Sequence, residues 1–225
     1  MSYPSRPTGY DVAYHVSRGP SDTHLTVGFD REQGHVPRFL VMLHYRASTD
    51  PVVWGAIARM DHNETSTQGH DVYREGLHVD AARNTSRPVH LQVRHAPLPP
   101  DPGVVVRKCV EYLRRNADFF IDVYEERRPP GSPPRWSADG GESGRTFIST
   151  DSVENGMSRE APAEDEVLTP EELSEELANA TGSTPEEIER GAAELEIAPP
   201  EEADVVGYGE HDGEHGFLTE PDAKH

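Results

Sequence analysis

The sequence contains a single cysteine, very little lysine and no long hydrophobic run. Cys109 is the only cysteine among 225 residues, so an intramolecular disulfide and a cysteine-based zinc site are both excluded. The longest apolar runs, at residues 39–43 and 52–58, are far too short to cross a bilayer. The opening MSYPSRPTGYD has no hydrophobic stretch of the kind found in signal peptides. We therefore expect a cytoplasmic protein without membrane association.

Lysine supplies only two of the 21 basic residues, and the acidic residues are unevenly distributed. Residues 1–150 hold 18 basic and 18 acidic residues, whereas residues 151–225 hold 3 basic and 23 acidic residues. The formal net charge of −20 therefore belongs to the C-terminal third. An arginine bias with an acidic excess predicts a haloarchaeal source, because carboxylates keep a chain hydrated where salt screens charge.

Alternating apolar residues predict strands at 24–30, 38–46, 52–61 and 87–95, with a short additional strand at 77–81. From Val104 to Tyr124 the period changes to three or four residues, as on one side of an amphipathic helix, and clustered prolines follow. The sequence therefore predicts an α+β domain over residues 23–128. We expect an antiparallel sheet of four to five strands with one long C-terminal helix packed on one face. The opposite face would carry His90, Gln92 and Arg94.

The segments around this domain have different compositions. Residues 1–22 are expected to form a flexible arm, and residues 129–166 have the composition of a disordered linker. The four letters TPEE occur at 169 and again at 184, each with a threonine N-cap, a proline at the first helical position and a glutamate that closes a capping box. These signals predict an acidic helical hairpin over 167–198, followed by a disordered acidic tail over 199–225. Direct DNA binding by the hairpin is disfavoured, because DNA affinity depends on cations and Arg190 is the only basic residue in its two helices.

The segment RMDHNETSTQGHDVYREGLHVD, residues 59–80, spaces three histidines eight residues apart and leaves three interpretations open. A metal site has six candidate ligands here, but the segment has no short fixed spacing such as HExxH, so no metal or cofactor is predicted. A solvated polar connection between strands is the second interpretation. Cleavage of nucleic acid by acid–base chemistry is the third, because histidine titrates near neutral pH and arginine binds phosphate. The catalytic candidates are His62, His70, His78 and Tyr73; the candidates for binding phosphate or an acidic partner are Arg46, Arg59, Arg74 and Arg94.

An aromatic strand ending in Arg59, Asp61, His62 and Asn63 is followed by a loop with His70, Tyr73, Arg74 and His78, then by a strand and a closing helix. This order, over about residues 24–126, resembles the TumE-type toxins of prokaryotic toxin–antitoxin pairs and an uncharacterised group of haloarchaeal proteins of similar layout. The chain differs from that family in a longer NETSTQG insertion and in its C-terminal 75 residues.

The resemblance implies a toxin that acts on RNA, by metal-independent cleavage if it is an enzyme, with an antitoxin-like protein partner. The alternative is a non-catalytic protein-interaction or regulatory module with an acidic tail. The usual antitoxin carries a DNA-binding helix-turn-helix, which suggests a further hypothesis. The acidic hairpin would cover the arginine and histidine face of the sheet as a tethered, partner-like module.

Overall fold

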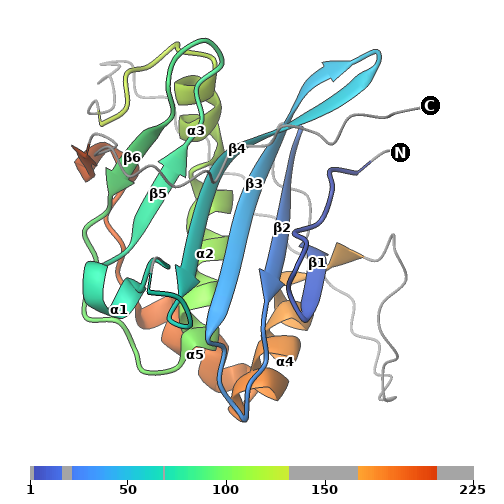
Figure 1. Ribbon diagram of the computed structural model, residues 1–225, viewed down its shortest axis with the longest axis vertical. Helices are drawn as coiled ribbons and strands as arrows, with labels where there is room; N and C mark the ends of the chain where they lie inside the picture. The colour runs from blue at the N-terminus through green and yellow to red at the C-terminus, as the bar shows by residue number, and fades with distance from the viewer. Residues whose placement is uncertain (1–2, 17–21, 68, 132–166, 207–225) are drawn as a thin grey trace, which may run out of the picture.

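A computed structural model describes residues 3–16, 22–67, 69–131 and 167–206. Its strands are β1 (Val12–Val16), β2 (Thr23–Phe29), β3 (Arg38–Thr49), β4 (Val52–Asn63), β5 (His78–Ala81), β6 (Val89–Gln92), β7 (Val167–Leu168) and β8 (Asp204–Val206). Its α-helices are α1 (Val72–Glu75), α2 (Pro102–Arg115), α3 (Ala117–Tyr124), α4 (Pro170–Thr181) and α5 (Pro185–Glu194), and a 3₁₀ turn η1 covers Pro200–Glu202. Figure 1 shows one twisted sheet with α2 and α3 behind it.

The sheet is larger than the sequence predicted. The strands of the described residues run in the order β7-β1-β2-β3-β4-β5-β6-β8, and β7 pairs with β1 in parallel while the other neighbours are antiparallel. The expected antiparallel sheet of four to five strands is therefore wrong. The additional strands β1, β7 and β8 have five, two and three residues and form the two edges of the sheet. They come from segments for which no strand was predicted.

The expected single long helix is also wrong. It begins as predicted, with the Asp101 side chain accepting a hydrogen bond from the Gly103 N–H and with Pro102 at the first position. It stops at Asn116, whose backbone leaves helical geometry and whose side-chain amide donates to the Tyr112 carbonyl at 2.8 Å. The chain continues as α3, so two shorter helices cover the sheet.

The core lies between the sheet and these helices. The register sets Val27 opposite Val41 and Val41 opposite Met60, and all three side chains are buried. Val110 and Phe120, from α2 and α3, belong to the same apolar cluster. Because neighbouring residues of a strand point to opposite faces, the intervening side chains of β4, β5 and β6 point away from the helices. We call that side of the sheet the outer face.

The acidic hairpin packs behind the sheet rather than on its outer face. Both capping boxes expected at Thr169 and Thr184 are present, and α4 and α5 contact α2. Leu173, Leu177 and Ile188 are completely buried in the cluster that includes the sheet residues. The hypothesis that the hairpin covers the arginine and histidine face is therefore wrong for residues 167–198. Most of the expected linker (132–166) and tail (207–225) lies outside the described residues.

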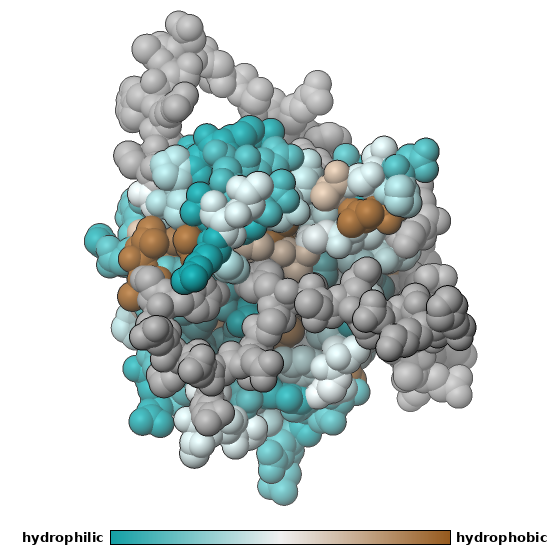
Figure 2. Space-filling model, turned by 45° about the horizontal axis from the view of Figure 1, so that its top comes forward, coloured by the Kyte–Doolittle hydropathy of each residue, from teal (hydrophilic) through white to brown (hydrophobic). Residues whose placement is uncertain are grey.

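The coloured part of the face seen in Figure 2 is mainly hydrophilic, with small apolar patches between polar residues. The large apolar side chains that are most exposed are Val52, Val53, Tyr73, Val205 and Val206. None of the helices in the described part of the chain combines the length and apolarity that a membrane span requires.

Candidate functional site on the outer face

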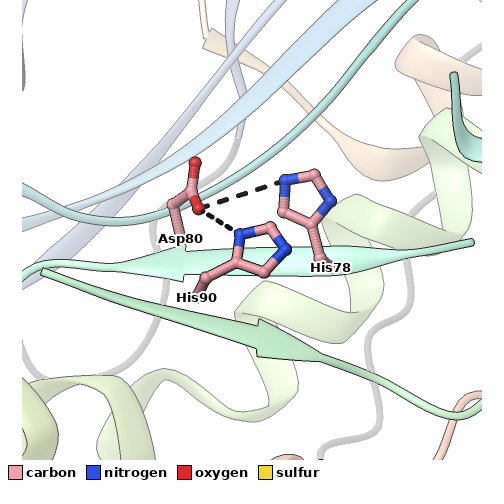
Figure 3. Close-up of side chains that lie close together, drawn as sticks. All are labelled: His78, Asp80 and His90. Carbon is pink, nitrogen blue, oxygen red and sulfur yellow. Dashed lines mark hydrogen bonds and ion pairs between the residues drawn. The ribbon is translucent and has the colours of Figure 1, made fainter. Parts of the chain in front are cut away.

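Three side chains from two neighbouring strands converge on the outer face: His78 and Asp80 of β5 and His90 of β6 (Figure 3). His78 and Asp80 are two residues apart and therefore share a face, while Val79 between them is buried in the core. The antiparallel register sets His90 directly opposite Asp80. One potential ligand atom from each of the three residues lies within 4.8 Å of the others. We call this set the β5–β6 cluster.

The Asp80 carboxylate is the hub of the cluster. Its Oδ1 lies 2.8 Å from His90 Nδ1, and its Oδ2 accepts from Arg59 Nε at 2.8 Å. Burial on its own would raise the pKa of this carboxyl. The hydrogen bond from His90 and the positive charge of Arg59 outweigh burial and lower the pKa of Asp80 to about 2. The cluster therefore contains an ionised carboxylate at neutral pH.

His78 is enclosed between two other imidazoles. Its ring centroid lies 3.8 Å from that of His70 and 3.9 Å from that of His90, and the residue is 7% exposed. Burial, followed by the neighbouring His70 and His90, lowers the pKa of His78 to about 3. Its Nδ1 is buried without a hydrogen-bond partner among the described residues, and its Nε2 lies 4.0 Å from Asp80 Oδ1. That distance is too long for a hydrogen bond.

His70 reaches the cluster from the loop before α1. Its Nδ1 lies 2.9 Å from a carboxylate oxygen of Glu75 and its Nε2 lies 3.0 Å from the Gly76 carbonyl oxygen. An ionised carboxylate and a carbonyl can only accept, so both bonds are made only when the ring has a proton on each nitrogen. His70 therefore faces two acceptors through its nitrogens, while its ring meets the His78 ring edge-on.

A second carboxyl lies beside Arg59 on β4. Arg59 Nε is 3.9 Å from Asp61 Oδ1, and that oxygen is buried without a hydrogen-bond partner among the described residues. Burial raises the pKa of Asp61, Arg59 opposes the increase, and Asp80 adds to it. Arg59 thus lies near carboxylates on two strands. Its shorter contact, at 2.8 Å, is with Asp80, so it holds the Asp80 carboxylate in place.

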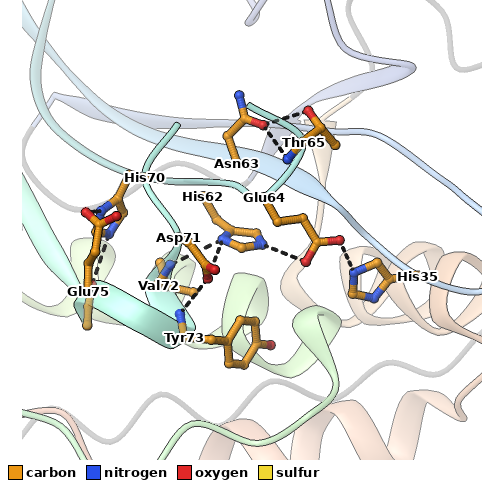
Figure 4. Close-up of polar contacts among 11 residues, drawn as sticks. His35, His62, Asn63, Glu64, Thr65, His70, Asp71, Val72, Tyr73 and Glu75 are labelled. Carbon is orange, nitrogen blue, oxygen red and sulfur yellow. Dashed lines mark hydrogen bonds and ion pairs between the residues drawn. The ribbon is translucent and has the colours of Figure 1, made fainter. Parts of the chain in front are cut away.

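His62 and Tyr73 belong to a different group, on the helix side of β4 (Figure 4). His62 is completely buried, and its Nδ1 accepts a hydrogen bond from the Val72 N–H at 3.3 Å. The Tyr73 ring meets the His62 ring edge-on, with centroids 5.7 Å apart. Burial lowers the pKa of His62, while the carboxylates of Asp71 and Glu64 oppose the decrease. His62 therefore anchors α1 to β4 and does not join the outer-face cluster.

The other predicted arginines do not converge on the cluster. Arg46, toward the C-terminal end of β3, forms an ion pair with Asp22. Arg74 is exposed on α1. Arg94 lines an open groove of about 680 Å³ together with Lys108 and Arg115 of α2. Of the eight site residues expected from the sequence, the structure brings His70, His78 and Arg59 together.

A further histidine group lies on β1–β3. His15 Nδ1 is 2.9 Å from His24 Nε2, and His44 Nε2 is 2.9 Å from the Thr26 hydroxyl. All four of these residues are buried, and Tyr3 packs against the rings of His15 and His24. These imidazoles satisfy one another and nearby hydroxyls, as expected of a buried polar network. We assign them a structural role.

Sequence reasoning missed His90 as a site residue. The available signal was the pair His78 and Asp80 at a spacing of two on a predicted strand, with His90 on the same face of another predicted strand. The length of the loop between β5 and β6 does not determine which residues of the two strands lie opposite each other. The pairing of Asp80 with His90 is therefore seen only in the folded sheet.

The family model described as "Domain of unknown function (DUF7718)" matches residues 12–129, and the chain belongs to this family. No curated protein and no solved structure matches the chain. The matched residues include the whole β5–β6 cluster and end before the α4–α5 hairpin begins.

Proposed function

We propose that this member of the DUF7718 family acts on phosphodiester bonds of RNA at the outer face of its sheet, in the manner of the toxins that its sequence resembles. The observation that carries the proposal is the contact of the His78 ring with the rings of His70, which it meets edge-on, and His90, beside the ionised Asp80. Burying titratable groups in close contact costs folding free energy, and such arrangements are concentrated at functional sites.

His70 is the proton donor in this proposal. Its ring nitrogens lie 2.9 Å from the Glu75 carboxylate and 3.0 Å from the Gly76 carbonyl, which orient the ring, and a histidine held in this way can act as a general acid toward a leaving oxygen. The side chain of His70 is 12% exposed and that of Glu75 is 59% exposed, so a substrate approaches this edge from solvent. The group that activates the nucleophile belongs to the neighbouring β5–β6 cluster.

The arginines have two different roles. Arg59 positions Asp80 through their 2.8 Å bond and is engaged before any substrate arrives. Arg74 does not contact the cluster, but it is exposed on the short helix that follows His70, and in this proposal it holds a substrate phosphate next to the cluster. Arg46 and Arg94 have no part in this site.

Two readouts test the proposal with the full chain: growth after induced expression in a sensitive host, and degradation of a labelled RNA by the purified protein. We expect growth arrest and cleavage with the wild type, and a reduction of cleavage by about 100-fold or more in His70→Gln, because loss of a general acid typically costs that much. His35→Gln is the matched control. His35 is an exposed histidine paired with Glu64 outside the cluster, and its replacement should leave both readouts unchanged. Absence of both arrest and cleavage with the wild type would refute the proposal.

One observation favours a non-catalytic protein-interaction module as the second candidate. The four arginines expected to bind phosphate are spread over the molecule, and two of them are already paired with Asp22 and Asp80. The same variants separate the two candidates. Growth arrest that persists in His70→Gln, without RNA cleavage by the wild type, supports binding to a protein partner such as an antitoxin.

A further inference from the structure

We propose that His78, Asp80 and His90 bind one divalent transition-metal ion, with Zn²⁺ as the probe that represents the class. Two imidazoles and one carboxylate are a recurrent ligand set for zinc and for non-haem iron(II). The spacing of these residues in the sequence is not a short helical motif, which is why the sequence alone predicted no metal. The sheet register creates the ligand set.

The distances in the cluster are close to those of a metal site. Ligand atoms bound to one zinc ion at about 2.0–2.2 Å are roughly 3–4 Å apart. Asp80 Oδ1 lies 2.8 Å from His90 Nδ1 and 4.0 Å from His78 Nε2. Small rotations of the three side chains are sufficient to surround an ion.

The two oxygens of Asp80 have separate partners, as in many metal sites. Arg59 binds Oδ2, whereas Oδ1 faces both imidazoles. An outer partner on one carboxylate oxygen fixes the orientation of the other oxygen toward the metal. Arg59 is therefore a positioning residue for the ligand Asp80.

His78 provides the independent observation. It is a buried polar side chain whose Nδ1 has no hydrogen-bond partner among the described residues, and its Nε2 points toward Asp80 at a distance too long for a hydrogen bond. The surrounding contacts of the ring are the imidazoles of His70 and His90, which pack against it through ring contacts. Coordination of an ion by Nε2 gives that nitrogen a partner beside Asp80, whereas Nδ1 stays without a partner among the described residues.

This inference deepens the proposed function, since three protein ligands leave coordination positions open for a water molecule. With an ion bound, cleavage would be metal-dependent, unlike the metal-independent cleavage that the resemblance implies: the β5–β6 cluster would supply a bound water as the nucleophile, and His70 would remain the proton donor. Metal binding is nevertheless measured without RNA. If Zn²⁺ binds at the cluster and RNA is not cleaved, the proposed function fails and the metal site stands. If RNA is cleaved and no metal binds at the cluster, the metal site fails and the proposed function stands.

The experiment is a titration of the metal-free full chain with Zn²⁺ against a chromophoric chelator. The C-terminal segment contains His211, His215 and His225, so all titrations use a background in which these three are asparagine. In that background we expect one Zn²⁺ per chain, displacement of a proton, and a higher melting temperature in the presence of Zn²⁺. His35→Gln, outside the cluster, should bind as the background does.

Two ligand variants complete the test. His78→Leu removes a side chain that makes no hydrogen bond to the described residues, so the fold is retained; we expect at least a 100-fold loss of affinity and no thermal shift with Zn²⁺. Asp80→Asn should show the same loss, and the spectrum of secondary structure identifies a variant that has unfolded. Affinity unchanged in a folded His78→Leu, or no binding by the background protein, would overturn the inference.

Discussion

Asp80 of β5 and His90 of β6 lie directly opposite each other in the sheet, and the His90 Nδ1–H donates to the Asp80 carboxylate across 2.8 Å. Arg59 donates to the other oxygen of the same carboxylate. One buried anion thus links three neighbouring strands, β4, β5 and β6.

The first prediction concerns the stability of this link. Asp80→Asn removes the charge that two donors share and leaves Arg59 without its principal partner, so the free energy of unfolding in urea should fall by about 3 kcal/mol. His78→Leu removes no hydrogen bond to the described residues and should change it by less than about 1 kcal/mol. Equal losses in the two variants would show that Asp80 is not the hub.

The second prediction compares two tyrosines. The Tyr14 hydroxyl donates to Glu176 at 2.8 Å and accepts from Arg31 at 3.1 Å, whereas the buried Tyr112 hydroxyl has no partner among the described residues. Tyr14→Phe should lower the free energy of unfolding by about 1–2 kcal/mol, and Tyr112→Phe should leave it unchanged or raise it. Each variant is the control for the other, and a larger loss in Tyr112→Phe would contradict the contacts described.

The third prediction concerns pH. Burial, with His24 and His15 nearby, lowers the pKa of His44 to about 3, so the folded protein holds this ring neutral where the unfolded chain binds a proton. The effect of His44 on the free energy of unfolding is therefore constant above about pH 6.5. As the pH falls from there toward 3, His44 lowers the free energy of unfolding by about 1.4 kcal/mol per pH unit. Urea unfolding between pH 7 and pH 5 should show a shallower slope in His44→Gln than in the wild type; identical slopes would mean that His44 is protonated in the folded state.

The fourth prediction concerns the docking of the acidic hairpin. Arg107 of α2 has a buried side chain that binds both carboxylate oxygens of Glu189 on α5, at 2.9 and 3.2 Å. Glu189→Ala leaves this guanidinium without its carboxylate, so the free energy of unfolding should fall by about 2 kcal/mol. Glu194→Ala, an exposed position near the end of the same helix, is the matched control and should have little effect. A comparable loss of unfolding free energy in Glu194→Ala would show that the ion pair with Arg107 is not the cause of the loss in Glu189→Ala.

Much of the fold follows from local patterns. The strands at β2, β3, β4 and β6 have the alternation that the sequence predicted, and the two capping boxes begin α4 and α5 where expected. The edge strands β7 and β8 have two and three residues, too few for a periodic pattern. The break at Asn116 lies within an apolar stripe that continues from Leu113 to Phe120, so the spacing of apolar residues does not reveal it.

The candidate site was harder to predict because it depends on register and on strand faces. His62 and His78 look equivalent in the loop sequence, yet His62 lies under Phe39 and Tyr73 on the helix side while His78 is on the outer face. His90 entered the site only through its pairing with Asp80. A shift of one residue between β5 and β6 would have sent it to the core.

The most direct test of the account is a crystal structure of the full chain grown with Zn²⁺, with anomalous scattering recorded on both sides of the zinc absorption edge. The account predicts a zinc peak bonded to His78 Nε2, Asp80 Oδ1 and His90 Nδ1, with Arg59 still bound to Asp80 Oδ2. A structure in which these three side chains are as described and no zinc lies between them would contradict it.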